Sequence, residues 1–148
     1  MNARDALLQR ITKRMVHTRE LLEEFDDRSA ELKRVNTAWN VRDLVAHLAY
    51  WTDEGAKQIP VLAAGGKKRD YDIERINDEV FNKNKRMPFL MLLPRLRAAE
   101  DGFLAAVRAV EPKLLADDTP VRQWVEGIGV EHYDAHRQSL EEAVGLVS

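Results

Sequence analysis

Three histidines are the residues of this chain whose type and spacing point most clearly to chemistry. His132 and His136 stand four residues apart, and His47 lies far upstream. Residues i and i+4 lie about one turn apart on the same face of a helix. Two imidazoles at that spacing can bind one metal ion, and a third from another helix completes a facial ligand set with an open position. The three histidines are therefore candidate ligands of one metal ion.

The setting of the histidine pair leaves two readings open. On a helical wheel, His132 falls near the middle of the apolar face of a C-terminal helix and His136 near its edge. Such a pair fits metal ligands about as well as hydrogen-bonded core residues. Gly127 and Gly129 precede it, and each lowers helix stability by about 1 kcal/mol relative to alanine, so we expect them to make room for something. His17 projects from a polar face, and we predict that it lies at the surface.

Candidate acid–base groups lie near the same face. Glu100 stands between Leu96 and Phe103 on the apolar side of a predicted helix, where an unpaired charge is very unfavourable. We expect it to pair with a ligand histidine, to act as an acid or base, or to turn toward water. Tyr133 is a second candidate for proton transfer. Four aromatic residues are expected to wall an apolar pocket: Trp39, Tyr50, Trp51 and Trp124.

Amphipathic helices must position these side chains, because apolar residues recur at intervals of three and four along most of the chain. Long helices are predicted over about 4–25, 41–64, 88–111 and 119–145, with a short one over about 73–82. No segment alternates apolar and polar residues as a strand would. The apolar face of the last helix is expected to hold Val121, Trp124, Val125, Ile128, Ala135 and Ala143. The pattern predicts an all-α fold, an antiparallel four-helix bundle with a short extra helix between its second and third helices.

Local signals predict where these helices begin and end. Asn40 is a good N-cap, and Asp43 three residues later resembles a capping box. Gly65 and the glycine after it are expected to stop the second helix. Pro60 is expected to bend the end of that helix. Pro94 stands several residues into the third helix, which predicts a kink or a later start there.

Composition limits the classes of function. The chain has 148 residues, the length of a single domain over 1–148, with 45% hydrophobic and 32% charged residues, as in soluble globular proteins. A net charge of −2 with dispersed Lys and Arg argues against nucleic-acid binding. The absence of cysteine excludes disulfides and thiolate sites. No phosphate or dinucleotide motif, apolar signal core or membrane-spanning run is found, so a cytoplasmic protein without membrane partners is expected.

Two segments resemble a known superfamily. The segment 39–51, WNVRDLVAHLAYW, resembles the tryptophan, valine-basic-aspartate-leucine and histidine-leucine signature of the DinB-like superfamily. The segment 132–136, HYDAH, is similar to the C-terminal histidine pair of that superfamily. Together with Ile76 and Asn77, this form of the pair most resembles the ClbS/DfsB branch. The resemblance spans essentially the whole chain.

The resemblance implies a four-helix bundle, often a homodimer, with a divalent metal that is commonly zinc, nickel or iron. The implied ligands are His47, His132 and His136. Some branches are thiol-dependent transferases or isomerases, whereas the ClbS/DfsB branch is associated with hydrolase-like self-protection against reactive DNA-alkylating natural products. Metal use is not uniform in that branch. The implied partner of the chain is a small reactive molecule, and the superfamily name does not imply DNA binding.

Three functional hypotheses follow. The first is a metal-dependent hydrolase or thiol transferase that acts on a small electrophile, with detoxification or self-protection as its role. The second is a metal-free protein of the ClbS/DfsB type that binds or sequesters a reactive molecule, or hydrolyses it with His132 or Glu100 as a general base. The third is a structural dimer whose histidines satisfy hydrogen bonds in the core.

Overall fold

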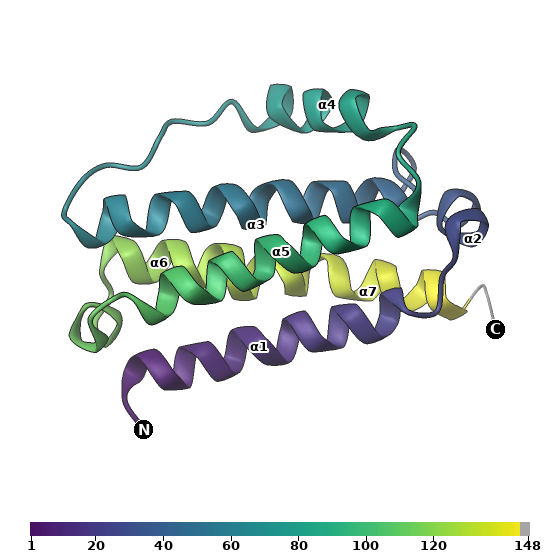
Figure 1. The fold of residues 1–148 in the computed structure, drawn as a ribbon. Coiled ribbons are helices and arrows are strands. Elements are labelled where there is room, and N and C mark those ends of the chain that lie inside the picture. The colour runs from purple at the N-terminus through teal and green to yellow at the C-terminus, as the bar shows by residue number, and fades with distance from the viewer. Residues whose placement is uncertain (146–148) are drawn as a thin grey trace.

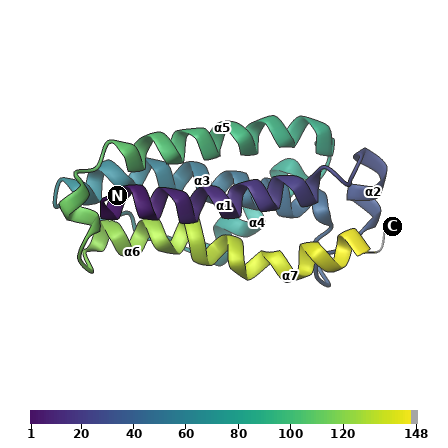
Figure 2. The same ribbon diagram turned by 90° about the horizontal axis from the view of Figure 1, so that it is seen from below.

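Four long helical segments lie side by side and form the body of the molecule (Figures 1 and 2). The structure is a computed structural model that describes residues 1–145. The long segments are α1 (Ala3–Leu22), α3 (Val41–Ala63), α5 (Phe89–Arg108) and a continuous run of α6 (Pro120–Glu126), the π-helix η2 (Gly127–Glu131) and α7 (His132–Gly145). The short elements are α2 (Asp27–Leu32), α4 (Ile73–Asn84) and the 3₁₀-helix η1 (Pro112–Leu115). The predicted all-α bundle with a short extra helix before its third long helix is confirmed.

The connection between α3 and α5 determines the direction of the helices. It crosses back along the whole length of α3 and carries α4 over the outside of that helix (Figure 1). Consequently α3 and α5 run in the same direction, while α1 and the α6–α7 run point the opposite way. The packing agrees, because the starts of α3 and α5 share one apolar cluster and their ends share another. Long crossovers of this kind are an established bundle connection.

The predicted helix boundaries have clear local causes. Asn40 and Asp43 form the expected capping box, in which each side chain accepts a hydrogen bond from the backbone N–H of the other. Gly65 ends α3 with a φ of 84°, a conformation that favours glycine. The N–H groups of Gly65 and Gly66 return to the carbonyls of Leu62 and Val61, which completes a Schellman motif.

The structure contradicts the late start considered for the third long helix and adds one short helix. α5 begins at Phe89, so Pro94 lies inside the helix without delaying its start. The proline removes one hydrogen bond, to the carbonyl of Leu90, and Leu90 is solvent-exposed, which leaves that carbonyl to water. α2 was not predicted, although Asp26 and Ser29 form a second capping box at its start. None of the helices within residues 1–145 is long and apolar enough to span a membrane.

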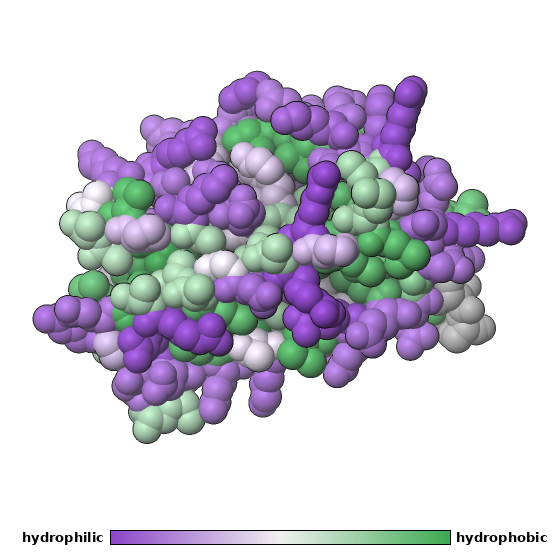
Figure 3. All heavy atoms as spheres, in the orientation of Figure 1, coloured by the Kyte–Doolittle hydropathy of each residue, from purple (hydrophilic) through white to green (hydrophobic). Residues whose placement is uncertain are grey.

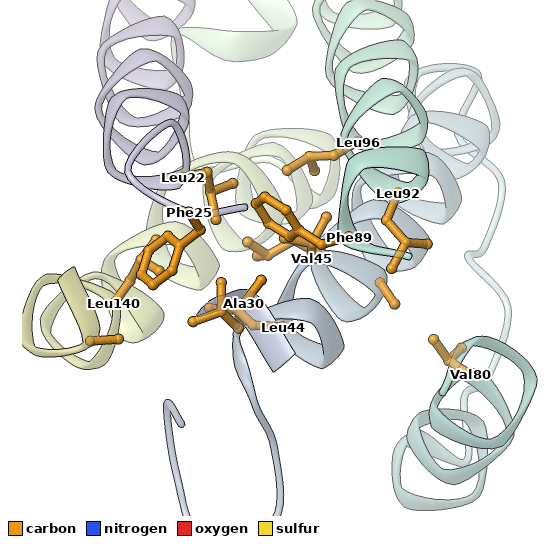
Figure 4. Close-up of a cluster of buried hydrophobic side chains, with 14 of the residues drawn as sticks. Leu22, Phe25, Ala30, Leu44, Val45, Val80, Phe89, Leu92, Leu96 and Leu140 are labelled. Carbon is orange, nitrogen blue, oxygen red and sulfur yellow. The ribbon is translucent and has the colours of Figure 1, made fainter. Parts of the chain in front are cut away.

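The core consists of two apolar clusters at opposite ends of the bundle. Figure 4 shows Leu22, Phe25 and Phe89 converging with residues of α2 and α3 in the cluster near α2. Polar side chains dominate the rim of the face in Figure 3, with apolar groups between them. Buried polar groups from all four long segments mark the boundary between the clusters: Thr18, Thr52, Glu100 and Tyr133. The candidate site lies along this polar layer, on α3 and α7.

Candidate metal centre

The three predicted histidines meet between α3 and α7. The Nε2 atom of His132 lies 2.8 Å from Nε2 of His47 and 3.2 Å from Nε2 of His136. One ligand nitrogen from each of the three lies within 4.8 Å of the others. Two nitrogens bound to tetrahedral zinc at about 2.0–2.1 Å stand about 3.3 Å apart. The three imidazoles therefore already have nearly the spacing of ligands to one ion.

The three imidazole rings are in the protonation state that a metal cation needs for binding. Burial, followed by the neighbouring His132 and His136, lowers the pKa of His47 to about 3. Burial and His136 lower the pKa of His132 to about 4, and burial also lowers the pKa of His136. All three imidazoles are consequently neutral near pH 7, and each offers one nitrogen lone pair. Neutral imidazoles with converging nitrogens are the donor set that zinc, nickel and iron accept.

In the described part of the chain, no hydrogen bond at Nδ1 fixes the tautomer of His47 or His132, so the tautomer depends on what Nε2 contacts. Within residues 1–145, Nδ1 of His47 and Nδ1 of His132 are buried and form no hydrogen bond. An ion bound at Nε2 would place the proton of each ring on Nδ1. The ring of Trp39 covers that of His47, with the two ring centroids 4.6 Å apart. Asn36 orients this tryptophan by accepting hydrogen bonds from the backbone of its turn.

The π-helix η2 sets the direction in which His132 and His136 point. It ends at Glu131, directly before His132, and π-bulges insert a residue that rotates all later positions about the helix axis. Ala135, which was expected on the apolar face, is exposed, whereas Tyr133 is 2% exposed. The expected apolar face is therefore wrong at Ala135, because a uniform period of 3.6 does not hold through this helix, whereas Ala143 is buried as expected.

Gly129 makes room for the core rather than for a ligand. A Cβ atom on it would lie 2.9 Å from the Phe103 ring and 3.0 Å from Ile11. Gly55 does the same on α3, where a Cβ atom would lie 2.7 Å from Ile128. These close approaches hold η2 against α1, α3 and α5. Gly127 has open space beside it and lines the cavity described next.

A cavity of about 440 Å³ opens beside the histidines. Its inner end is formed by His47 and His132, and two of the predicted pocket residues, Trp51 and Trp124, line its wall. The Trp124 indole donates a hydrogen bond to the carbonyl of Gly55, which fixes the ring. The Trp51 indole donates to Asn77 of α4 at 2.8 Å. An apolar wall with few convergent polar groups is typical of a small-molecule site.

The segment 64–72, called the strap here, supplies cavity residues that sequence reasoning missed. Its Tyr71 ring is parallel to the Trp124 ring, with centroids 6.0 Å apart. The buried carboxylate of Glu54 holds the strap down by accepting hydrogen bonds from Tyr71 at 2.8 Å and from Arg69 at 3.0 Å. Lys68 of the strap also lines the cavity. No local sequence signal marks Lys68, Arg69 or Tyr71, because the contacts that place them are with Glu54 and Trp124, which lie far away in the chain.

Other predicted site residues lie away from this cavity. Tyr133 donates a hydrogen bond of 2.8 Å to Glu100, and its hydroxyl lies 3.1 Å from that of Thr52. Glu100 lines a separate cavity between α1 and α5, and Tyr50 lines one between α3 and α4. The structure brings the three histidines together with Trp39, Trp51 and Trp124, and His17 lies at the surface as predicted.

Comparison with known proteins agrees with this architecture. Residues 6–141 match the family described as the mycothiol maleylpyruvate isomerase N-terminal domain. This family lies within the DinB/YfiT-like helical superfamily, so the resemblance to DinB-like proteins is confirmed. No curated protein and no solved structure matches the chain. The match spans nearly the whole chain and includes all three histidines, and the chain belongs to the mycothiol maleylpyruvate isomerase N-terminal domain family.

Proposed function

We propose that this protein is a metal-dependent enzyme that acts on a small electrophilic molecule with a small-molecule thiol as second substrate. The observation that carries the proposal is the convergence of three neutral imidazole nitrogens, two of them from histidines that line an aromatic-walled cavity. His47, His132 and His136 would hold one divalent ion, zinc, nickel or iron. Bound there, the ion would supply Lewis-acid chemistry and favour deprotonation of a thiol or water at its open position.

The residues of the cavity have separate tasks in this proposal. Trp51, Tyr71 and Trp124 bind the apolar part of the electrophile and exclude water from it. Trp39 shields the outer side of His47. We assign Glu100 and Tyr133 to holding the helices in register rather than to proton transfer, because neither lines this cavity.

The preference for a thiol reaction has two supports. The chain contains no cysteine, so any thiol that reacts in the cavity must come from a small molecule. The family description names mycothiol, and we extend that cosubstrate class to this chain. Transfer of a thiol to a reactive electrophile would make detoxification the biological role.

The runner-up is a hydrolase or sequestration protein of the ClbS/DfsB type. The segment 132–136 supports it, because this histidine pair resembles that branch. The same cavity would then hold a reactive molecule, with water as nucleophile or with no turnover. A metal-free version would retain full activity after chelator treatment.

Metal content tests the proposal first. We expect about one divalent ion per chain by mass spectrometry of untagged protein, and loss of that ion in H132A. H17A is the matched control, because His17 is an exposed histidine that pairs with Glu141 at 3.2 Å. Absence of metal from wild-type protein, even after incubation with zinc, nickel or iron, would exclude the metal-dependent enzyme.

Reaction with a model electrophile then separates thiol transfer from hydrolysis. We expect loaded wild-type protein to accelerate conjugation of a small thiol to 1-chloro-2,4-dinitrobenzene or an epoxide, and H132A to fall to the uncatalysed rate. Consumption of the epoxide at the same rate without thiol would favour the hydrolase. Consumption that stops at one equivalent would favour sequestration.

A further inference from the structure

The strap places a cation at the outer end of the histidine cavity. Lys68 lines the cavity together with His47 and His132. Its Nζ atom lies 5.8 Å from the centroid of the Tyr71 ring and 5.6 Å from that of Trp124. Both distances are within the range of a cation–π contact. The two rings therefore contact the ammonium group beside the cavity, while the Lys68 side chain stays exposed to solvent.

This cation has no ion-pair partner within residues 1–145. In the part of the chain that the structure describes, Lys68 forms no ion pair and no hydrogen bond. The neighbouring Arg69 differs, because its guanidinium lies 3.0 Å from the Glu54 carboxylate. A ring face accepts charge but takes up few of the three ammonium N–H donors. Lys68 therefore retains donors for an anion in the cavity.

The wall below the cation is flat and apolar. The rings of Tyr71 and Trp124 are inclined by only 12° to each other, and the Trp51 ring meets Tyr71 edge-on at 5.3 Å. Burial and Glu54 raise the pKa of Tyr71, so its hydroxyl remains protonated and continues to donate to Glu54. The hydrogen bond keeps the Tyr71 ring in place, and a flat apolar group can lie against the wall.

We propose that Lys68 is a specificity-determining residue, which selects substrates that carry an anionic group on a flat, apolar body. The proposal rests on the function proposed above, since the reacting end of such a substrate would face the histidines. Glu131 lines the same cavity, and its carboxylate would repel an anion. Removal of the charge of Lys68 should therefore weaken anion binding, and removal of the charge of Glu131 should strengthen it.

The test uses the full chain, as purified and after chelator treatment, with 2-naphthoate and 2-naphthamide as probes. The two compounds share one flat body and differ in the charged group. NMR titration of the indole N–H signals gives the affinity and the location together, because the chain has three tryptophans. We expect shifts at Trp51 and Trp124 and about fivefold tighter binding of the naphthoate, the size of a partly exposed charge contact.

Charge-neutral substitutions identify the responsible residue. K68Q should remove the preference for naphthoate, and E131Q should increase it two- to fivefold. K67Q is the matched control, because Lys67 is an exposed lysine of the strap that does not line the cavity, and it should retain the preference. An unchanged preference in K68Q, or no preference in wild-type protein, would overturn the proposal. Loss of preference in K68Q combined with absence of metal would overturn the proposed enzyme and leave the anion subsite standing.

Discussion

Glu100 is a single buried residue whose protonation makes the stability of this protein depend on pH. The carboxylate is 3% exposed, and burial raises its pKa from 4.5 to about 7 against the opposing effects of Tyr133 and Arg19. Because the folded state binds the proton more tightly than the unfolded state, stability decreases as the pH rises from about 4.5 to about 7. Above that range the whole loss of stability, about 3 kcal/mol, is present.

Substitution of Glu100 by Gln should remove this dependence. We expect the free energy of unfolding of E100Q, relative to wild type, to increase by about 3 kcal/mol between pH 4.5 and pH 8. Gln keeps an oxygen that can accept the Tyr133 hydrogen bond, so the packing around Tyr133 changes little. Urea unfolding at several pH values measures the difference. E24Q, at an exposed position just after α1, should show no such trend. A difference between E100Q and wild type that is independent of pH would refute this account.

At the scale of an element, the two glycines of η2 should respond oppositely to alanine. A Cβ atom on Gly129 would lie 2.9 Å from the Phe103 ring and 3.0 Å from Ile11, both 0% exposed. We expect G129A to lower stability by about 1–3 kcal/mol through overpacking. A Cβ atom on Gly127 would meet no atom of a neighbouring element within 4 Å, and G127A should raise stability by up to about 1 kcal/mol. Thermal unfolding of both variants measures the two changes in stability. Stabilisation by both substitutions would contradict the close approach of Gly129 to Phe103 and Ile11.

The helices were predictable from the sequence because their signals are local. Apolar periodicity and the Asn40 capping box depend on residues within a few positions of one another. The same reasoning placed His132 and His136 on one helix face and His47 beside the apolar stripe of another helix, and the structure brings the three together. The phase of the last helix could not be predicted in this way. A π-helix changes the period within one segment, so Ala135 is exposed and Tyr133 is buried.

The strap shows the other limit of local reasoning. Tyr71 and Arg69 take their places because they bind Glu54, which lies 17 and 15 residues earlier in the chain. Nothing in the residues around Lys68 indicates that a cation will stand over two aromatic rings. The site therefore divides into a histidine pair whose i, i+4 spacing can be read from the sequence and a cavity wall positioned by tertiary contacts, which no periodic pattern encodes.

For the whole molecule, the crossover between α3 and α5 links fold and site. It returns along α3 (Figure 1). Tyr71 of the strap therefore stacks on Trp124 of α6, and Asn77 of α4 binds Trp51. A short hairpin between these helices would have left the cavity without its outer wall. The histidines, in contrast, join α3 to α7, two segments far apart in sequence. An ion bound by them would therefore act as a cross-link of the bundle.

Metal binding should consequently stabilise the whole fold. An ion that binds only the folded chain adds about 2.7 kcal/mol at a concentration one hundred times its dissociation constant. For a domain of this length we expect Tm to rise by about 8 °C on loading and to fall again with a chelator. H132A should show no such shift, because it removes the nitrogen that lies closest to both other ligands. H17A should keep it, since His17 contacts Glu141 at the surface. An equal rise in Tm for H132A would mean that the ion binds elsewhere on the chain.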